Sequence, residues 1–148
     1  MEIQDVKDIG AMIKILSEAL RQQANRDCRE YNLTMQQMRI IHFLKKRENN
    51  EVTSQKDIQD FLKISHPTVV NILHLMKNKG FIETSVSPKD KRVKLVRLTG
   101  REEGFVTQMI QNRERLERQL VKGLSPKEQN DFLRFLKLAY QNIMETPW

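Results

Sequence analysis

The chain has 148 residues, of which 39% are hydrophobic and 30% charged, and its 26 Lys and Arg against 19 Asp and Glu give a formal net charge of +7. This composition is typical of one largely helical domain with a solvated surface, and the basic excess indicates a polyanionic partner. A single cysteine excludes an internal disulfide, and no apolar run is long enough to span a bilayer, so we expect a cytoplasmic protein that does not contact membranes.

The first segment, from Ile3 to about Glu30, has apolar residues at a period close to 3.6, which predicts a long amphipathic helix. A helix of roughly 25 residues extends past the core of one small domain, so we expect another surface to cover its apolar stripe. Asn32 and Leu33 are predicted to end this helix. Thr34 and Gln37 have the spacing of a capping box and predict the start of a second helix.

The second helix is expected to direct four apolar side chains toward the core: Met35, Met38, Ile41 and Leu44. Val52 is predicted to be a single extended residue that pairs with a later hairpin. Thr53 or Ser54 is the predicted N-cap of a third helix, which runs from Gln55 to about Leu62. The buried side of this third helix is expected to consist of Ile58, Phe61 and Leu62.

The segment after Ile64 predicts a fourth helix and a hairpin. Ser65 is the predicted N-cap, Pro67 is tolerated because no intrahelical donor is lost in the first turn, and Gly80 takes the left-handed position after the helix. The apolar stripe of this helix consists of Val69, Ile72, Leu73 and Met76. Residues 81–86 and 93–98 are rich in β-branched and apolar side chains, which predicts two strands that flank a tip at residues 87–92.

The last part of the chain predicts two more helices. Thr99, with Glu102 in capping-box register, is expected to begin a fifth helix that runs to about Lys122 and ends at Gly123. Its apolar side is expected to consist of Phe105, Val106, Met109, Ile110, Leu116 and Leu120. A Ser-Pro-Lys-Glu run at positions 125–128 begins a sixth helix. The apolar stripe of this last helix contains Phe132, Phe135, Leu136, Ala139 and Ile143.

The basic residues concentrate between Ser65 and Arg101. These 37 residues include eight Lys and Arg and only two acidic residues, so they carry +6 of the chain's net charge of +7. A helix followed by a cationic hairpin can place one element in a DNA groove and the other on the backbone. The order of elements therefore predicts a mainly α fold with a small β-wing, a winged helix-turn-helix protein whose partner is double-stranded DNA.

The fourth helix is the predicted recognition helix, because its apolar stripe leaves its other side chains pointing away from the core. We expect Asn71 to bond adenine and Thr68 or Val70 to contact a thymine methyl group. Free N–H groups at the start of the helix can meet a phosphate. The predicted DNA-binding residues of this helix are Ser65, His66, Pro67, Thr68, Val70, Asn71 and His74.

The hairpin tip is the predicted contact to the DNA backbone. We expect Lys89 and Lys91 to reach flanking phosphates and Arg92 to enter the minor groove. Phosphate repels Asp90, so its expected task is to hold Arg92 or Lys91 in one orientation. Lys89, Asp90, Lys91 and Arg92 complete the predicted DNA-binding set.

The chain resembles the MarR family of bacterial transcription regulators along nearly its whole length. Four segments carry the resemblance: L-T-x-x-Q at Leu33–Gln37, I-S-x-P-T-V at Ile64–Val69, K-G-F-I at Lys79–Ile82 and the wing at Ser87–Thr99. In the wing, Asp90 and Arg92 match the family pattern Asp-x-Arg-Asp-x-Arg, whereas Ser87 replaces its first Asp and Lys89 its first Arg.

The resemblance implies a single MarR-like domain of residues 1–148. Residues 34–101 would form the DNA-binding lobe, and residues 1–33 and 102–148 the dimerisation helices. It also implies a homodimer on a pseudo-palindromic operator, acting as a repressor that a small aromatic or other effector releases. No cofactor is expected apart from such an effector.

Two other interpretations stay open. The basic face of the winged-helix module could meet an acidic protein, or Cys28 could make the regulator redox-sensing. Cys28 continues the apolar stripe of the first helix, which favours its burial as a small hydrophobe. His42 is a candidate metal ligand, but the sequence offers too few partners for a zinc site, so no metal is predicted. The chain has no nucleophile-and-base pair and no phosphate loop, and we do not expect an enzyme.

Overall fold

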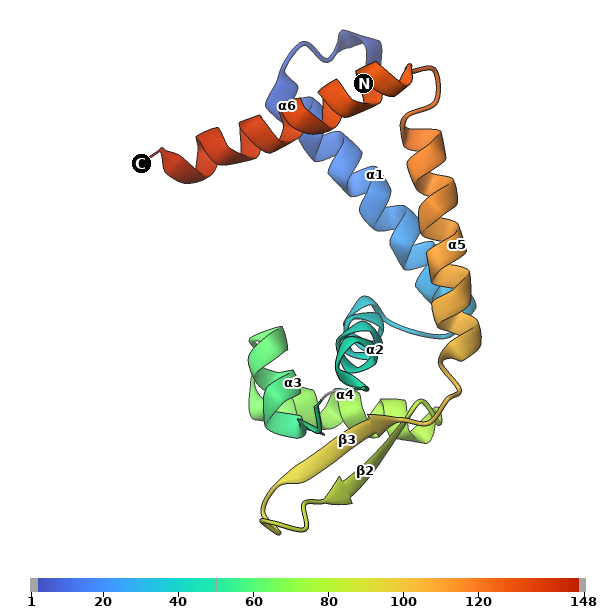
Figure 1. Cartoon of the computed structure of the whole chain (residues 1–148), viewed down its shortest axis with the longest axis vertical. Helices are drawn as coiled ribbons and strands as arrows, with labels where there is room; N and C mark the ends of the chain where they lie inside the picture. Colours follow the sequence, from blue (N-terminus) through green and yellow to red (C-terminus); the bar gives the residue numbers. More distant parts are fainter. Residues whose placement is uncertain (1–2, 50, 147–148) are drawn as a thin grey trace. The chain divides into compact units, whose positions relative to one another are not determined.

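The computed structural model describes residues 3–49 and 51–146. It confirms a mainly helical fold with a small antiparallel sheet (Figure 1). Its elements are a 3-10 helix η1 (Ile3–Asp5), α1 (Ile9–Glu30), α2 (Met35–Arg47), β1 (Thr53–Ser54), α3 (Gln55–Leu62), α4 (His66–Asn78), β2 (Ile82–Val86), β3 (Lys94–Leu98), α5 (Glu103–Leu120) and α6 (Pro126–Glu145).

The chain divides into two compact units, Met1–Met109 and Ile110–Trp148. The first unit contains α1 to α4, the sheet and the first turns of α5. The second contains the remainder of α5 and all of α6. We call the first unit's sheet together with α2, α3 and α4 the winged lobe.

The sheet has the strand order β1-β3-β2, with both pairs antiparallel. The expectation that Val52 pairs with the hairpin is wrong, because Thr53 and Ser54 make the pairing and Val52 is 73% exposed. Thr53 lies opposite Val96, and both residues are buried. The Thr53 hydroxyl also accepts a hydrogen bond from Arg47 Nε (3.1 Å), which fixes this residue at the sheet edge.

The predicted N-caps Thr34 and Ser125 are confirmed, and of the two candidates Thr53 and Ser54 the structure has Ser54 as the N-cap of α3. In each, the side-chain oxygen accepts the backbone N–H three residues later. The start of α1 differs from the prediction, since the helix begins at Ile9 and not near Ile3. Asp8 is the reason, because its carboxylate accepts the N–H of Ala11 (2.9 Å) and caps the helix there.

The start of α5 also corrects a prediction. Thr99 is not the N-cap and Glu102 is not its capping-box partner, since α5 begins at Glu103. Gly100, with a φ of 97°, turns the chain between them, and its N–H donates to the Glu102 carboxylate (2.8 Å). The Thr99 hydroxyl instead donates to the carbonyl of Gly80 (2.6 Å).

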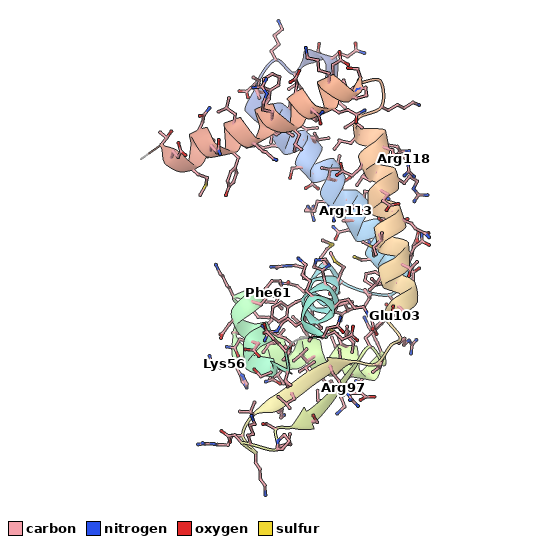
Figure 2. The ribbon with its side chains drawn as sticks, viewed as in Figure 1. Lys56, Phe61, Arg97, Glu103, Arg113 and Arg118 are labelled. Atoms are coloured by element: carbon pink, nitrogen blue, oxygen red, sulfur yellow. The ribbon has the colours of Figure 1, made fainter. Side chains whose placement is uncertain are left out.

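The core of the first unit draws buried side chains from α1 to α5 and from the sheet. Ile58, Val69 and Phe105 are buried as predicted, and Ile40, which was not among the predicted core residues, is fully buried. Phe61 is not buried as expected. Phe61, which is labelled on α3 in Figure 2, is exposed to 39%. Its ring stacks on Phe43 of α2, with ring centroids 4.3 Å apart.

No helix within residues 3–49 and 51–146 is both long and apolar enough to cross a membrane.

Candidate DNA interface

The outer face of α4 presents the side chains that the sequence predicted for DNA. Val69, Leu73 and Met76 are buried on the inner face. The predicted DNA-binding side chains lie on the exposed part of the helix or at its start: Ser65, His66, Pro67, Thr68, Val70, Asn71 and His74. The structure therefore brings the predicted helix residues together on one accessible surface.

The start of α4 differs in detail from the prediction. Ser65 occupies the N-cap position, but its side chain makes no capping hydrogen bond. Its hydroxyl lies 2.7 Å from the hydroxyl of Thr68 instead. The backbone N–H groups of His66 and Thr68, which have no acceptor within the helix, therefore lack a side-chain cap from Ser65. Exposed N–H groups at a helix start carry partial positive charge and favour an anion.

Two histidines on this surface have neighbours that restrict them. His66 Nδ1 lies 3.4 Å from the side-chain oxygen of Gln59 on α3, and His74 Nε2 lies 3.2 Å from the side-chain nitrogen of Asn78. The side chain of Asn71 is exposed and makes no hydrogen bond within the described part of the chain, so its amide donor and acceptor are available to a ligand. This pairing capacity is what bidentate recognition of adenine requires.

The wing tip holds its charged residues in a closed turn. Asp90 accepts two hydrogen bonds from Arg92, one from the backbone N–H (3.0 Å) and one from Nε (3.3 Å). The backbone bond, and after it the side-chain bond, lowers the pKa of the Asp90 carboxyl. The predicted contact of Asp90 with Arg92 is thus present. Lys89 and Lys91 are exposed on either side.

Not every basic residue of the cluster is available to a partner. Lys79 donates from Nζ to the carbonyl of Asn32 (2.5 Å) and to the side chain of Gln37 (3.0 Å), so the protein itself uses this charge. Arg97 pairs with Glu83 across the strands at 2.8 Å.

Two further basic residues belong to this surface, although they were not among the predicted site residues. Lys77, on the last turn of α4, is exposed and donates to the Thr84 hydroxyl on β2 (3.1 Å), which joins the helix to the wing. Lys94 is exposed at the start of β3, next to the tip. Their only sequence signal was membership of the charge cluster between Ser65 and Arg101.

Cys28 lies in the core and not at the surface. It is 1% exposed, and its thiol contacts Met35 Sδ at 3.7 Å. Burial, with a smaller contribution from Asp27, raises the pKa of the Cys28 thiol, which disfavours the reactive thiolate. His42 is exposed, and residues 3–49 and 51–146 contain no group of three His, Cys, Asp or Glu side chains placed to hold a metal ion.

An open groove crosses the sheet beside the end of α2. Its lining includes the carboxylates of Glu48, Glu51 and Glu83. Each of them pairs with a basic side chain of this chain, at 3.0 Å, 2.6 Å and 2.8 Å respectively. A cationic ligand would have to displace these pairs, so the groove is a weaker candidate site than α4 and the wing.

Comparisons with known proteins agree with this geometry. Residues 31–93 match the model of the MarR family. MepR, a transcription regulator of the Staphylococcus aureus multidrug efflux pump MepA, has 22% sequence identity and a TM-score of 0.83 over 92% of this chain and 98% of MepR. A MepR–DNA complex has 23% identity and a TM-score of 0.75 over 90% and 98% of the two chains. The heme sensor protein PefR from Streptococcus agalactiae, in complex with heme, has 26% identity and a TM-score of 0.64 over 93% and 95%.

Proposed function

We propose that this chain is a transcription regulator of the MarR family, whose model matches residues 31–93, and that it binds double-stranded DNA sequence-specifically as a homodimer in the cytoplasm. One observation carries the proposal: the winged lobe combines an exposed polar face on α4 with a cationic tip on the adjoining hairpin. A regulator, and not an enzyme, is what this surface and the family support.

The helix and the wing are proposed to have different tasks. Asn71 contacts an adenine, and Thr68 or Val70 contacts a thymine methyl group in the major groove. Lys89, Lys91 and Arg92 bind the phosphate backbone, with Arg92 at the minor groove. The hydrogen bonds from Arg92 to Asp90 support this division, because they restrict the side chain that must enter a narrow groove.

A phosphate is proposed to bind the start of α4. The N–H groups of His66 and Thr68 have no side-chain cap from Ser65, whereas α1, α2, α3 and α6 all have a side-chain cap. A DNA phosphate at this position would satisfy these donors and would fix the depth of the helix in the groove.

The homodimer is proposed to form through residues 1–33 and 102–148. The α6 helix supports this, since none of residues 126–145 is buried in the single chain. Its exposed apolar side chains are Leu133, Phe135, Leu136, Leu138, Tyr140, Ile143 and Met144. A partner chain that covers them would relate two recognition helices by a two-fold axis, and the operator would be a pseudo-palindrome.

Repression with release by a small-molecule effector is the proposed mode of action. The support is the family and the similarity to PefR, a sensor protein that binds heme. The buried Cys28, with its raised thiol pKa, gives no support to redox sensing.

A salt titration tests the proposal. The affinity for an operator selected from a random DNA library is measured by gel shift at several salt concentrations. We expect a log–log slope steeper than about −4, since each phosphate contact contributes roughly −0.9. Recovery of a palindrome would support the two-fold dimer. A flat salt dependence would contradict DNA binding and would favour an acidic protein as the partner of the basic face.

A further inference from the structure

The short connection between the sheet and α5 is tied to its surroundings at both ends. At its start, the Thr99 N–H donates to the Phe81 carbonyl (3.2 Å), and the Thr99 hydroxyl donates to Gly80 (2.6 Å). Arg101 lies over the Phe81 ring, with its guanidinium carbon 5.6 Å from the ring centroid. These contacts hold residues 99–101 against the turn between α4 and β2.

At its other end, the connection meets a single lysine of α2. Lys45 Nζ lies 2.5 Å from Glu103 Oε1 and 3.0 Å from Glu48 Oε2, and it lies 3.7 Å from Glu102 Oε1. The hydrogen bonds that Lys45 donates to Glu103, and after it to Glu48, raise the pKa of the Lys45 ammonium. We call Lys45, Glu102 and Glu103 the α2–α5 ion cluster. Figure 2 shows Glu103 at the start of α5.

Glu102 is the buried member of this cluster and requires a nearby cation. The residue is fully buried, and one carboxylate oxygen accepts the Gly100 N–H (2.8 Å) while the other, Oε1, has no hydrogen-bond partner within the described residues. A buried carboxylate is costly unless a cation lies close to it. Lys45 is the cation within ion-pair distance, so displacement of the first turn of α5 away from α2 would leave the Glu102 charge unpaired.

We propose that the α2–α5 ion cluster is a positioning device: it fixes the direction in which α5 leaves the winged lobe and thereby sets the half-site spacing that the homodimer accepts. This inference rests on the proposed function. Lys45, Glu102 and Glu103 do not contact DNA in this scheme. They act through the helix that connects the lobe to the proposed dimerisation region.

The geometry of a helix makes small changes at this point consequential. The α5 helix has 18 residues, Glu103–Leu120. At about 1.5 Å per residue, its length is roughly 27 Å, so a tilt of about 10° at the first turn displaces the far end by roughly 5 Å. That displacement exceeds the rise of about 3.4 Å between successive base pairs. A fixed exit direction is therefore needed for a fixed spacing.

Two variants and one matched control test the proposal. Glu103→Gln removes the shortest ion pair at an exposed position, and Lys45→Met removes the shared cation while it keeps the alkyl chain. Lys46→Met is the control, because Lys46 is the next residue of α2, is exposed, and makes no ion pair in the described part of the chain. Binding is measured on duplexes whose two half-sites lie at the selected spacing or one base pair closer or farther, and on a duplex with one half-site.

We expect the wild type and Lys46→Met to prefer one spacing. In Glu103→Gln and Lys45→Met, the ratio of the affinity at the selected spacing to the affinity at the other spacings should fall by about tenfold, which is within the range of coupling between sites. Binding to the single half-site should be unchanged in all four proteins. An unaltered spacing profile in Glu103→Gln would overturn the proposal. An equal loss of half-site affinity in both variants would also overturn it, because the cluster would then only stabilise the lobe.

A second measurement needs no DNA. With spin labels at Lys91→Cys in a Cys28→Ala background, the distance distribution between the two wing tips of the dimer should broaden in Glu103→Gln and stay narrow in Lys46→Met. Equal widths would contradict the inference. If the wild type shows no preferred spacing on DNA, the proposed function fails, and the label distances alone decide the role of the cluster.

Discussion

Single basic residues of the lobe fall into two classes according to what they contact. Lys79 is held by Asn32 and Gln37, and Arg97 by Glu83, so these cations serve the fold. Lys89 and Lys91 are exposed at the tip. Charge alone therefore overstates the DNA-binding surface, and the division between the two classes can be tested by substitution.

Replacement of Lys79 by methionine should reduce stability without a direct effect on the DNA surface. It removes two hydrogen bonds, and Gln37, which is 2% exposed, loses its charged donor. We expect the free energy of unfolding to fall by about 1–3 kcal/mol, as measured by urea denaturation. Lys46→Met is the control and should change it by less than about 0.5 kcal/mol. An equal effect of the two substitutions would contradict a structural role for Lys79.

Asn71 and Arg92 should respond differently to truncation. Asn71→Ala should lose about 1–3 kcal/mol per half-site on the selected operator, with little loss on random DNA, because it removes the proposed base contact. Arg92→Ala should weaken binding to all sequences alike. It should also make the log–log salt slope shallower by about 0.9 for each wing, the contribution of one phosphate contact. Gel-shift titrations on both DNAs separate these outcomes. Identical behaviour of the two variants would refute the division between base and backbone contacts.

At the scale of elements, a column of aromatic and cationic side chains joins α3 to α2. Phe43 and Phe61 stack at 4.3 Å, Arg39 lies over the Phe61 ring and Arg47 over the Phe43 ring. Because α3 packs against α4, this column contributes to the position of the proposed recognition helix.

Phe61→Leu tests the contribution of this column. The substitution keeps an apolar side chain but removes the stacking and the contact with Arg39. We expect a loss of about 0.5–1.5 kcal/mol in the free energy of unfolding, measured from urea midpoints. Val52→Ala, at a site that is 73% exposed, is the control and should have no measurable effect. If Phe61→Leu is equally silent, the stack does not stabilise the lobe.

The element boundaries show which local signals suffice. Side-chain capping at Thr34, Ser54 and Ser125 depends on residues three positions apart, so the sequence predicted these starts correctly. Thr99 has the same local signal, but its hydroxyl donates to Gly80, 19 residues away in the chain. A capping pattern does not reveal such a tertiary competitor, and this is why the predicted start of α5 was wrong.

The candidate site shows the same limit. The periodic stripe with Val69 and Met76 was sufficient to predict which side of α4 is exposed. It was not sufficient to show that Lys79 is bound by Gln37 or that Glu102 is fully buried, because both depend on contacts between distant segments. Sequence periodicity therefore predicts which side of one helix is exposed. The contacts of its residues with distant segments become known only from the fold.

At the scale of the whole molecule, the proposed dimer depends on apolar side chains that one chain does not cover. Phe135 and Ile143, on α6, are 54% and 58% exposed. Exposed aromatic and aliphatic side chains on one helix mark an interaction surface, and in this chain they lie outside the winged lobe. Dimerisation and the fold of the lobe should therefore be separable.

A double substitution, Phe135→Asp with Ile143→Asp, tests this separation. A buried carboxylate must lose its hydration, so we expect the dimer to weaken by at least about tenfold in sedimentation equilibrium. The affinity for a full operator should fall, whereas the affinity for one half-site should not. Lys137→Gln, an exposed position on the same helix, is the control for a change in charge. Wild-type dimerisation of the double variant would exclude α6 from the interface.

The hydrogen bonds of Gln37 also constrain how this protein can evolve. Gln37 accepts from the backbone N–H of Thr34 (3.1 Å) and from Lys79 (3.0 Å). Glutamate fills the same capping position and would pair with Lys79, so a lineage can exchange Gln37 for glutamate while the lysine is in place. Once that exchange has occurred, loss of Lys79 would leave a buried charge without its partner. Exchange of Gln37 for glutamate is therefore tolerated only while Lys79 is present. We expect the residues at positions 37 and 79 to covary among descendants.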